Sequence, residues 1–251
     1  MTALPASRED SLAMPLAATS SARRQARQIC DGCQRPLRAC LCSFVPATKI
    51  RVGAGGFESI HGIIVYVHPL EKKRTFRSCP LLQMCVEGVH AIETRRPVVP
   101  SPPPPSPLLI YRTDTSRPLS SVLPSLSFPV TLVALDGTWQ HTKEMYRAAP
   151  WLADLPAVHL DASETKGYFC DVRHAPLELV ELGAVSTAEA VACVVSGMGR
   201  WLSDEAVSRC DEVVGRLLQG VGDMQERAKT EEKDKGREGR AVCDHEGDDG
   251  W

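Results

Sequence analysis

A carboxylate, a hydroxyl and an indole follow one another closely in the segment Leu-Asp-Gly-Thr-Trp at residues 135–139. An apolar run precedes this segment and a helical pattern follows it, so it lies where a strand ends. In open α/β sheets, ligands bind at the carboxyl ends of the strands. Asp136, Thr138 and Trp139 thus offer a general base, a hydrogen-bonding group and a stacking surface. In the alternative interpretation, Asp136 or Thr138 caps the helix and Trp139 packs in the core.

Four cysteines near the amino terminus have the spacing C-x2-C-x6-C-x-C and are Cys30, Cys33, Cys40 and Cys42. The first pair directs two thiolates at one ion, and Asp31-Gly32 between them favours a tight turn. Four thiolates form a closed tetrahedral shell, which is typical of structural rather than catalytic Zn²⁺. The alternative is four cysteines with unrelated roles, which their clustering disfavours. The other six of the ten cysteines are scattered, as buried thiols would be.

A second polar segment, His68-Pro69-Leu70-Glu71, follows an apolar run that ends at Val67. The basic residues Lys72, Lys73 and Arg74 come directly after it. One interpretation is a ligand or RNA contact with a small basic patch. The other is a polar loop with solvated charges, and composition alone favours it.

A third segment, Ser186-Thr187-Ala188-Glu189, has the form of a helix capping box, in which Ser186 caps and Glu189 reaches back. The amino terminus of a helix also attracts carboxylates and phosphates, so capping and binding are compatible. Arg173 is a candidate anion contact and could equally be a surface charge.

Hydrophobic periodicity predicts the elements that position these residues. Apolar and β-branched runs predict strands at 62–67, 108–111, 130–135 and 157–160. Apolar residues at helical spacing predict helices at 79–92, 140–149 and 186–202, with a further helix whose apolar residues lie between 207 and 221. This alternation predicts an α/β fold with a mainly parallel sheet and helices on both faces.

The length of 251 residues suits one domain with flanking tails. We expect the domain to span residues 30–222, with disordered tails at 1–29 and 223–251. Within it, residues 30–42 form the cysteine module. Residues 97–107 are rich in proline and predict an extended loop insertion.

The 29 Lys and Arg against 31 Asp and Glu give a net charge of -2, so RNA binding would need a local patch. We expect no membrane span, because the chain lacks an apolar run of about 18 residues. Without a secretory segment, the cysteines indicate a reducing compartment, the cytoplasm or nucleus. The arginines before residue 28 faintly resemble an organelle transit peptide, but Glu9 and Asp10 favour an ordinary tail.

Taken together, residues 30–220 resemble the DTW-domain family of tRNA-uridine aminocarboxypropyltransferases. The shared motifs occur in the family's order, and they are the cysteine module with Arg35-Pro36, His-Pro-x-Glu at 68–71, the pentad at 135–139 with Pro150-Trp151-Leu152, Arg173 before Pro176, and Ser-Thr-x-Glu-Ala at 186–190. Departures are Val67 for Gln, Ser78 for Thr, His141-Thr142-Lys143 for Gln-Ala-Lys, and the proline-rich insertion.

The resemblance implies a SPOUT-like fold with a knotted C-terminal half and S-adenosylmethionine as the donor. The 3-amino-3-carboxypropyl group would pass to N3 of a tRNA uridine, giving acp3U and methylthioadenosine. Two alternatives are a SPOUT-type RNA methyltransferase that uses the same donor and a non-catalytic zinc-knuckle RNA-binding protein.

In this interpretation Asp136 is the general base, and Trp139 stacks on adenine or uracil or packs in the core. We expect the donor to contact Thr138, Trp139, Ser186, Thr187 and Glu189. We expect tRNA to contact His68, Glu71, Lys72, Lys73, Arg74, Lys143 and Arg173.

Overall fold

The structure is a computed structural model that describes residues 28–33, 35–37, 40–54, 57–74, 77–161, 185–202, 215–217, 219–223, 226, 227 and 230. The chain divides into two compact units, Met1–Cys40 and Leu41–Trp251. In the first unit, a turn is closed by a bridge between Ile29 and Pro36 and by a 2.7 Å hydrogen bond from Cys30 N to Arg35 O. The tails predicted at 1–29 and 223–251 lie almost entirely outside the described residues.

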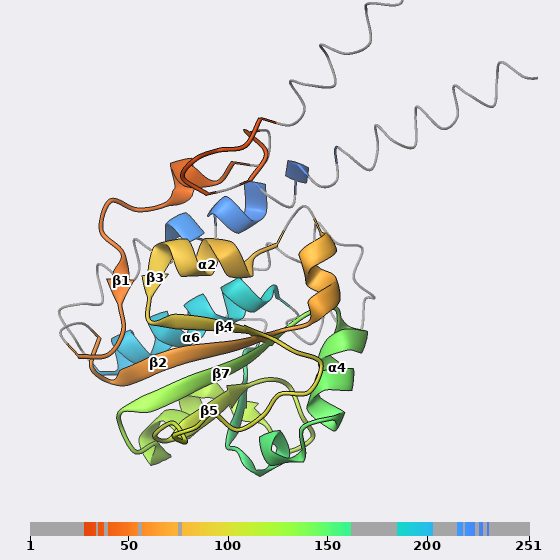
Figure 1. Ribbon diagram of the computed structural model, residues 1–251. Coiled ribbons are helices and arrows are strands. Elements are labelled where there is room, and N and C mark those ends of the chain that lie inside the picture. Colours follow the sequence, from red (N-terminus) through yellow and green to blue (C-terminus); the bar gives the residue numbers. More distant parts are fainter. Residues whose placement is uncertain are drawn as a thin grey trace, which may run out of the picture. The chain divides into compact units, whose positions relative to one another are not determined.

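A six-stranded sheet with the order β4-β2-β7-β5-β8-β6 forms the centre of the second unit (Figure 1). Its strands are β2 (Ile60–Val67), β4 (Val89–Glu93), β5 (Pro107–Ile110), β6 (Arg117–Pro118), β7 (Val130–Asp136) and β8 (Ala157–His159). A small second sheet pairs β1 (Ile50–Arg51) with β3 (Val86–Glu87). Every pairing in both sheets is parallel, which confirms the predicted mainly parallel sheet. The carboxyl ends of the strands in each sheet therefore point the same way.

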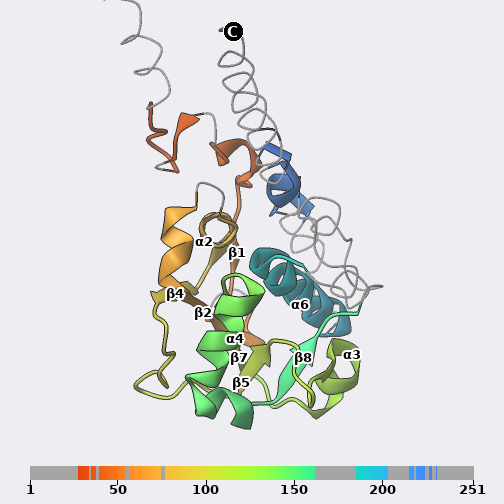
Figure 2. The ribbon, with the colours of Figure 1, turned by 90° about the vertical axis from the view of Figure 1, so that its right-hand side faces the viewer.

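Helical segments cover both faces of the six-stranded sheet, as predicted (Figure 2). The named helical segments of the described residues are η2 (Cys42–Phe44), η3 (Pro69–Lys73), α2 (Cys79–Cys85), α3 (Leu119–Val122), η4 (Leu123–Ser125), α4 (Trp139–Arg147), η5 (Pro150–Asp154) and α6 (Thr187–Leu202). One apolar core joins the sheet to α2, α3 and α6, and the other joins it to α4 and η5.

The sequence of strand β7 is a nearly continuous apolar run because the strand is buried on both faces. All seven of its residues are buried, because it lies between β2 and β5 with helices on both faces. Leu132 and Ala134 face the core with α6, whereas Val133 and Leu135 face the core with α4. This alternation follows from the two-residue period of a strand.

The predicted helix at 79–92 is wrong beyond Cys85, because β3 and β4 take up its second half. Val86, Val89 and Ile92 have helical spacing, but β3 pairs with β1 and β4 pairs with β2. Gly88 separates the two strands with a φ of 89°, a left-handed conformation that ends a helix. In the sequence, the β-branched Val86 and Val89 on either side of this glycine already favoured strands over a helix.

The other predicted strands and the helices at 140–149 and 186–202 are confirmed to within one or two residues. Of the helix predicted around 207–221, residues 215–217 and 219–221 are helical, and residues 207–214 and 218 lie outside the described residues. The C-terminal knot stays a prediction, because residues 162–184 also lie outside the described residues. None of the described helices has the length and hydropathy needed to cross a membrane.

The proline-rich segment lies between β4 and β5, and β5 begins at its last residue, Pro107. Two side chains, one from β2 and one from η5, bind the first residues of this loop. Tyr66 donates a hydrogen bond of 2.6 Å from its hydroxyl to Val98 O, and Trp151 donates one of 3.0 Å from Nε1 to Pro97 O. Most of the loop is exposed.

Candidate active site and metal centre

The loops that follow β2 and β7 begin side by side at the carboxyl edge of the sheet. Val67 is the register partner of Asp136, the last residue of β7. The backbone nitrogen of His68 donates a hydrogen bond of 2.9 Å to Asp136 O. Asp136 is only 8% exposed. The structure thus brings the His-Pro-x-Glu segment and the pentad together at the edge where open α/β sheets bind ligands.

Gly137 is needed here for space. A Cβ atom at Gly137 would lie 3.0 Å from the Cβ of His141 and 3.4 Å from the Cβ of His68. Both histidines therefore approach the backbone directly after Asp136.

Thr138 caps α4, with its side chain accepting a hydrogen bond of 3.2 Å from His141 N. The capping interpretation is therefore confirmed for Thr138. Trp139 is 42% exposed, so its alternative role as a core residue is wrong. An exposed indole beside Asp136 suits stacking on a flat ligand.

His68 and His141 stack on each other, with ring centroids 3.9 Å apart and an interplanar angle of 11°. His68 is completely buried, and its Nδ1 accepts a hydrogen bond of 3.3 Å from Leu70 N. In the neutral ring the proton is therefore on Nε2, which has no hydrogen-bond partner among the described residues. Glu144 Oε2 lies 3.8 Å from that nitrogen, too far for a hydrogen bond.

Burial lowers the pKa of His68 below its ordinary value of 6.5, and the nearby charges of His141 and Arg95 lower it further. The carboxylates of Glu144 and Glu71 act in the opposite direction without reversing the shift. Between the lowered pKa and 6.5, the unfolded chain binds more protons than the folded chain does. The free energy of unfolding therefore falls as the pH falls through this interval.

We expect the wild-type protein to lose more thermal stability than a His68→Gln variant when the pH is lowered from about 7 to about 5. Glutamine can accept the hydrogen bond from Leu70 N but does not titrate. The midpoint of thermal unfolding across a pH series measures the difference. His90→Gln, an exposed histidine on β4, is the control and should follow the wild-type profile. Parallel profiles for the wild type and His68→Gln would contradict the assignment.

Glu71 is buried and lies beside His141, one of the two stacked histidines. Its Oε1 lies 3.6 Å from His141 Nδ1 and 3.3 Å from Arg74 Nε. In the sequence, His141 stands out only as a departure from the family's Gln, and no motif points to Glu144. His141 lies beside His68 and Glu71, and Glu144 lies beside His68. These tertiary contacts exist because α4 passes beside η3.

The capping box at the start of α6 is confirmed. Ser186 N donates to Glu189 Oε2 at 2.8 Å, and Glu189 N donates to Ser186 Oγ at 3.3 Å. The Thr187 hydroxyl donates a hydrogen bond of 3.4 Å to Leu135 O. The amino terminus of α6 therefore lies against the end of β7, next to Asp136. The candidate anion contact Arg173 lies outside the described residues.

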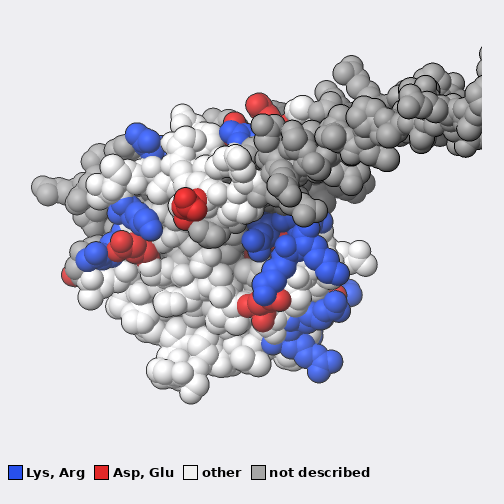
Figure 3. Space-filling model, turned by 45° about the horizontal axis from the view of Figure 1, so that its top comes forward, with Lys and Arg blue, Asp and Glu red and all other residues white. Residues whose placement is uncertain are grey.

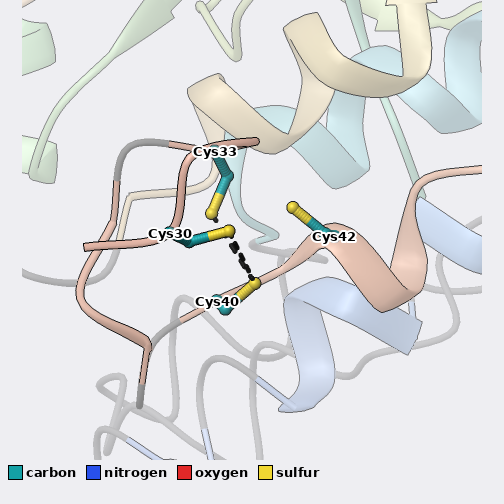
Figure 4. A group of neighbouring side chains, drawn as sticks. All are labelled: Cys30, Cys33, Cys40 and Cys42. Atoms are coloured by element: carbon teal, nitrogen blue, oxygen red, sulfur yellow. Dashed lines mark hydrogen bonds between the residues drawn. The ribbon is translucent and has the colours of Figure 1, made fainter. Parts of the chain in front are cut away.

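The four cysteines of the amino-terminal module converge, with all four sulfurs within 4.8 Å of one another (Figure 4). The Sγ atom of Cys40 lies 3.4 Å from that of Cys30 and 3.8 Å from that of Cys33. A tetrahedral site with Zn–S bonds of about 2.3 Å places its sulfurs about 3.8 Å apart. The donor set and spacing thus fit one structural Zn²⁺.

The other described cysteines differ from this cluster. Burial raises the pKa of Cys79 to about 12 and that of Cys85 to about 11, so both are protonated thiols in the core. None of the cysteines in the described part of the chain forms a disulfide. Among the described residues this agrees with the prediction of one cysteine cluster and, for Cys79 and Cys85, with that of buried thiols.

Comparison with known proteins identifies the family of this chain. The chain is 30% identical over 194 residues to a Drosophila melanogaster protein named tRNA-uridine aminocarboxypropyltransferase 2, a match that covers 73% of this chain and 72% of that protein. It is also 30% identical over 200 residues to a protein named tRNA-uridine aminocarboxypropyltransferase A of Arabidopsis thaliana, and this match covers 66% of this chain and 70% of that protein. No solved structure matches the chain. The family model for the DTW domain matches residues 27–218, and the chain therefore belongs to the DTW-domain family.

Proposed function

We propose that this protein is a tRNA-uridine aminocarboxypropyltransferase that uses S-adenosylmethionine and forms acp3U at N3 of a tRNA uridine. One observation carries the proposal. The buried carboxylate that ends β7, the start of α6 and the histidine loop after β2 meet at one edge of the sheet. The relatives' names supply the reaction class.

Asp136 is the proposed general base. Uridine N3 carries a proton and is a weak nucleophile until that proton leaves. Asp136 is a largely buried carboxylate at the start of the loop after β7, and such a group is suited to accept the N3 proton. The sulfonium donor supplies an activated alkyl carbon, so no metal is needed at that carbon. The remaining task of the protein is to align N3 with the carbon, which is a problem of positioning.

The donor is proposed to lie between the pentad and the start of α6. The Thr138 hydroxyl accepts a hydrogen bond as the helix cap and keeps its proton to donate to a ligand. Ser186, Thr187 and Glu189 lie at the amino terminus of a 16-residue helix, next to the pentad, where they would contact the amino-acid end or the ribose of the donor. The exposed indole of Trp139 offers a stacking face for adenine or uracil.

The tRNA is proposed to contact the loop after β2 and the exposed face of α4. His68 and Glu71 are buried and position this loop, whereas Lys72, Lys73 and Arg74 are exposed. Lys143 on α4 is exposed as well, and Arg173 remains part of the proposal. The target uridine must leave its stack to reach Asp136.

Mass spectrometry tests this function directly. The purified protein is incubated with unmodified tRNA and S-adenosylmethionine, and the tRNA nucleosides and by-products are then identified. We expect a uridine that carries a 3-amino-3-carboxypropyl group, with methylthioadenosine released. A methylated nucleoside with adenosylhomocysteine would instead indicate an RNA methyltransferase. Binding of tRNA without consumption of the donor would indicate a non-catalytic RNA-binding protein.

A further inference from the structure

The carboxyl ends of three neighbouring strands, β4, β2 and β7, bring separate basic segments to one edge of the sheet. The segment after β2 carries Lys72, Lys73 and Arg74. The segment after β4 carries Arg95 and Arg96, and α4 after β7 carries Lys143. All six side chains are exposed. The sequence motifs include four of them, whereas the pair after β4 becomes part of this surface only through the strand order.

Contacts between these segments show that they are neighbours. Lys72 forms an ion pair with Glu93, the last residue of β4. Arg95 Nη1 lies 3.6 Å from Glu144 Oε1 on α4. The surface formed by the six cations is therefore continuous across η3, the end of β4 and α4, and below we refer to it as the basic edge.

The turn that carries Arg95 and Arg96 is held in place by hydrogen bonds from the backbone and the hydroxyl of Thr94. Thr94 N donates 3.0 Å to Val67 O at the end of β2. The Thr94 hydroxyl accepts a hydrogen bond of 3.0 Å from Arg96 N and donates one of 3.1 Å to Arg96 O. Both arginines thus start from an ordered backbone, which lowers the entropic cost of binding.

The charge of the basic edge contrasts with that of the whole chain. The chain carries a net charge of -2, yet Lys and Arg side chains gather on the side where η3 and α4 lie in Figure 1, with a small acidic group among them (Figure 3). Glu93 and Glu144 at this edge already face Lys72 and Arg95. The exposed cations therefore outnumber the acids there.

We propose that Arg95 and Arg96 bind phosphates of the tRNA backbone and orient the tRNA over Asp136. This inference rests on the proposed function. Cations spread over three segments match the repeated charges of a nucleic-acid backbone better than one small anion. A guanidinium can hold a phosphate with two hydrogen bonds. The loop after Asp136 and the exposed Trp139 adjoin the same edge, where an unstacked base would arrive.

The test compares a double variant, Arg95→Gln with Arg96→Gln, with a control of equal charge change, Arg51→Gln with Arg117→Gln. Arg51 lies on β1 and pairs with Glu87 on β3, in the small second sheet. Arg117 lies on β6, the outermost strand on the side of the six-stranded sheet away from β4. Binding of unmodified tRNA is measured without donor over a series of salt concentrations. We expect the double variant to bind about ten-fold more weakly and the salt slope to decrease by about one to two. The control should match the wild type.

Each failure has its own signature. If the wild type binds and modifies tRNA but the double variant shows unchanged affinity and salt slope, the inference about Arg95 and Arg96 is wrong. If the double variant loses binding to vesicles containing phosphatidylserine while tRNA binding stays unchanged, the surface serves a membrane and the inference is wrong. If the wild type forms no modified uridine, the proposed function fails. Equal thermal unfolding midpoints of the variants show that all are folded.

Discussion

Replacing Asp136 with Asn is expected to slow aminocarboxypropyl transfer by about 10²–10⁴-fold, the usual contribution of general acid–base catalysis. Asparagine keeps the shape of the side chain but removes the basic carboxylate that would accept the N3 proton. Donor binding should change much less, because the proposed donor contacts lie on Thr138 and the start of α6. The release of methylthioadenosine, measured with donor affinity and thermal stability, separates these effects.

The structure sharpens this experiment, because Thr138 and not Asp136 caps α4. Asp136→Asn therefore leaves the helix cap in place, and a loss of turnover is not explained by a lost cap. Asp154→Asn, an exposed aspartate in η5, is the matched control and should keep wild-type turnover. Near-wild-type turnover in Asp136→Asn would remove Asp136 from the mechanism.

Replacing Cys33 with Ser is expected to abolish zinc binding and unfold the cysteine module. Wild-type protein should hold about one zinc ion per chain through Cys30, Cys33, Cys40 and Cys42. Zinc bound by such a shell supplies about 10–16 kcal/mol of apparent binding free energy in small zinc domains, and that energy supports their folding. Atomic absorption and protease sensitivity of the module measure the loss.

The control for this prediction is Cys193→Ser on α6, which lies outside the cluster and should retain zinc. Chelation of the metal should reproduce the protease sensitivity of Cys33→Ser in the wild type. A metal-free protein that stays folded and fully active would contradict a structural role for the ion.

Local sequence determined the parts of this protein whose pattern is complete within a few residues. The buried strand β7 and the pentad that ends it, the capping box at Ser186, and the C-x2-C…C-x-C module are all of this kind. Residue type and spacing within each of these segments suffice to predict its local structure, even where distant segments complete its packing, as they do for β7. The same holds for the proline-rich loop, because proline cannot continue a helix or a central strand.

Tertiary structure decided the rest. Residues 86–93 have helical spacing, yet they form β3 and β4 because β1 and β2 offer parallel partners and Gly88 breaks the helix. The stack of His68 on His141 exists because β2 and β7 are neighbours, so that η3 and α4 begin side by side. The exposure of Trp139 and the basic edge around Arg95 depend on the same strand order. Strand order joins segments far apart in the chain, and no local pattern encodes that pairing.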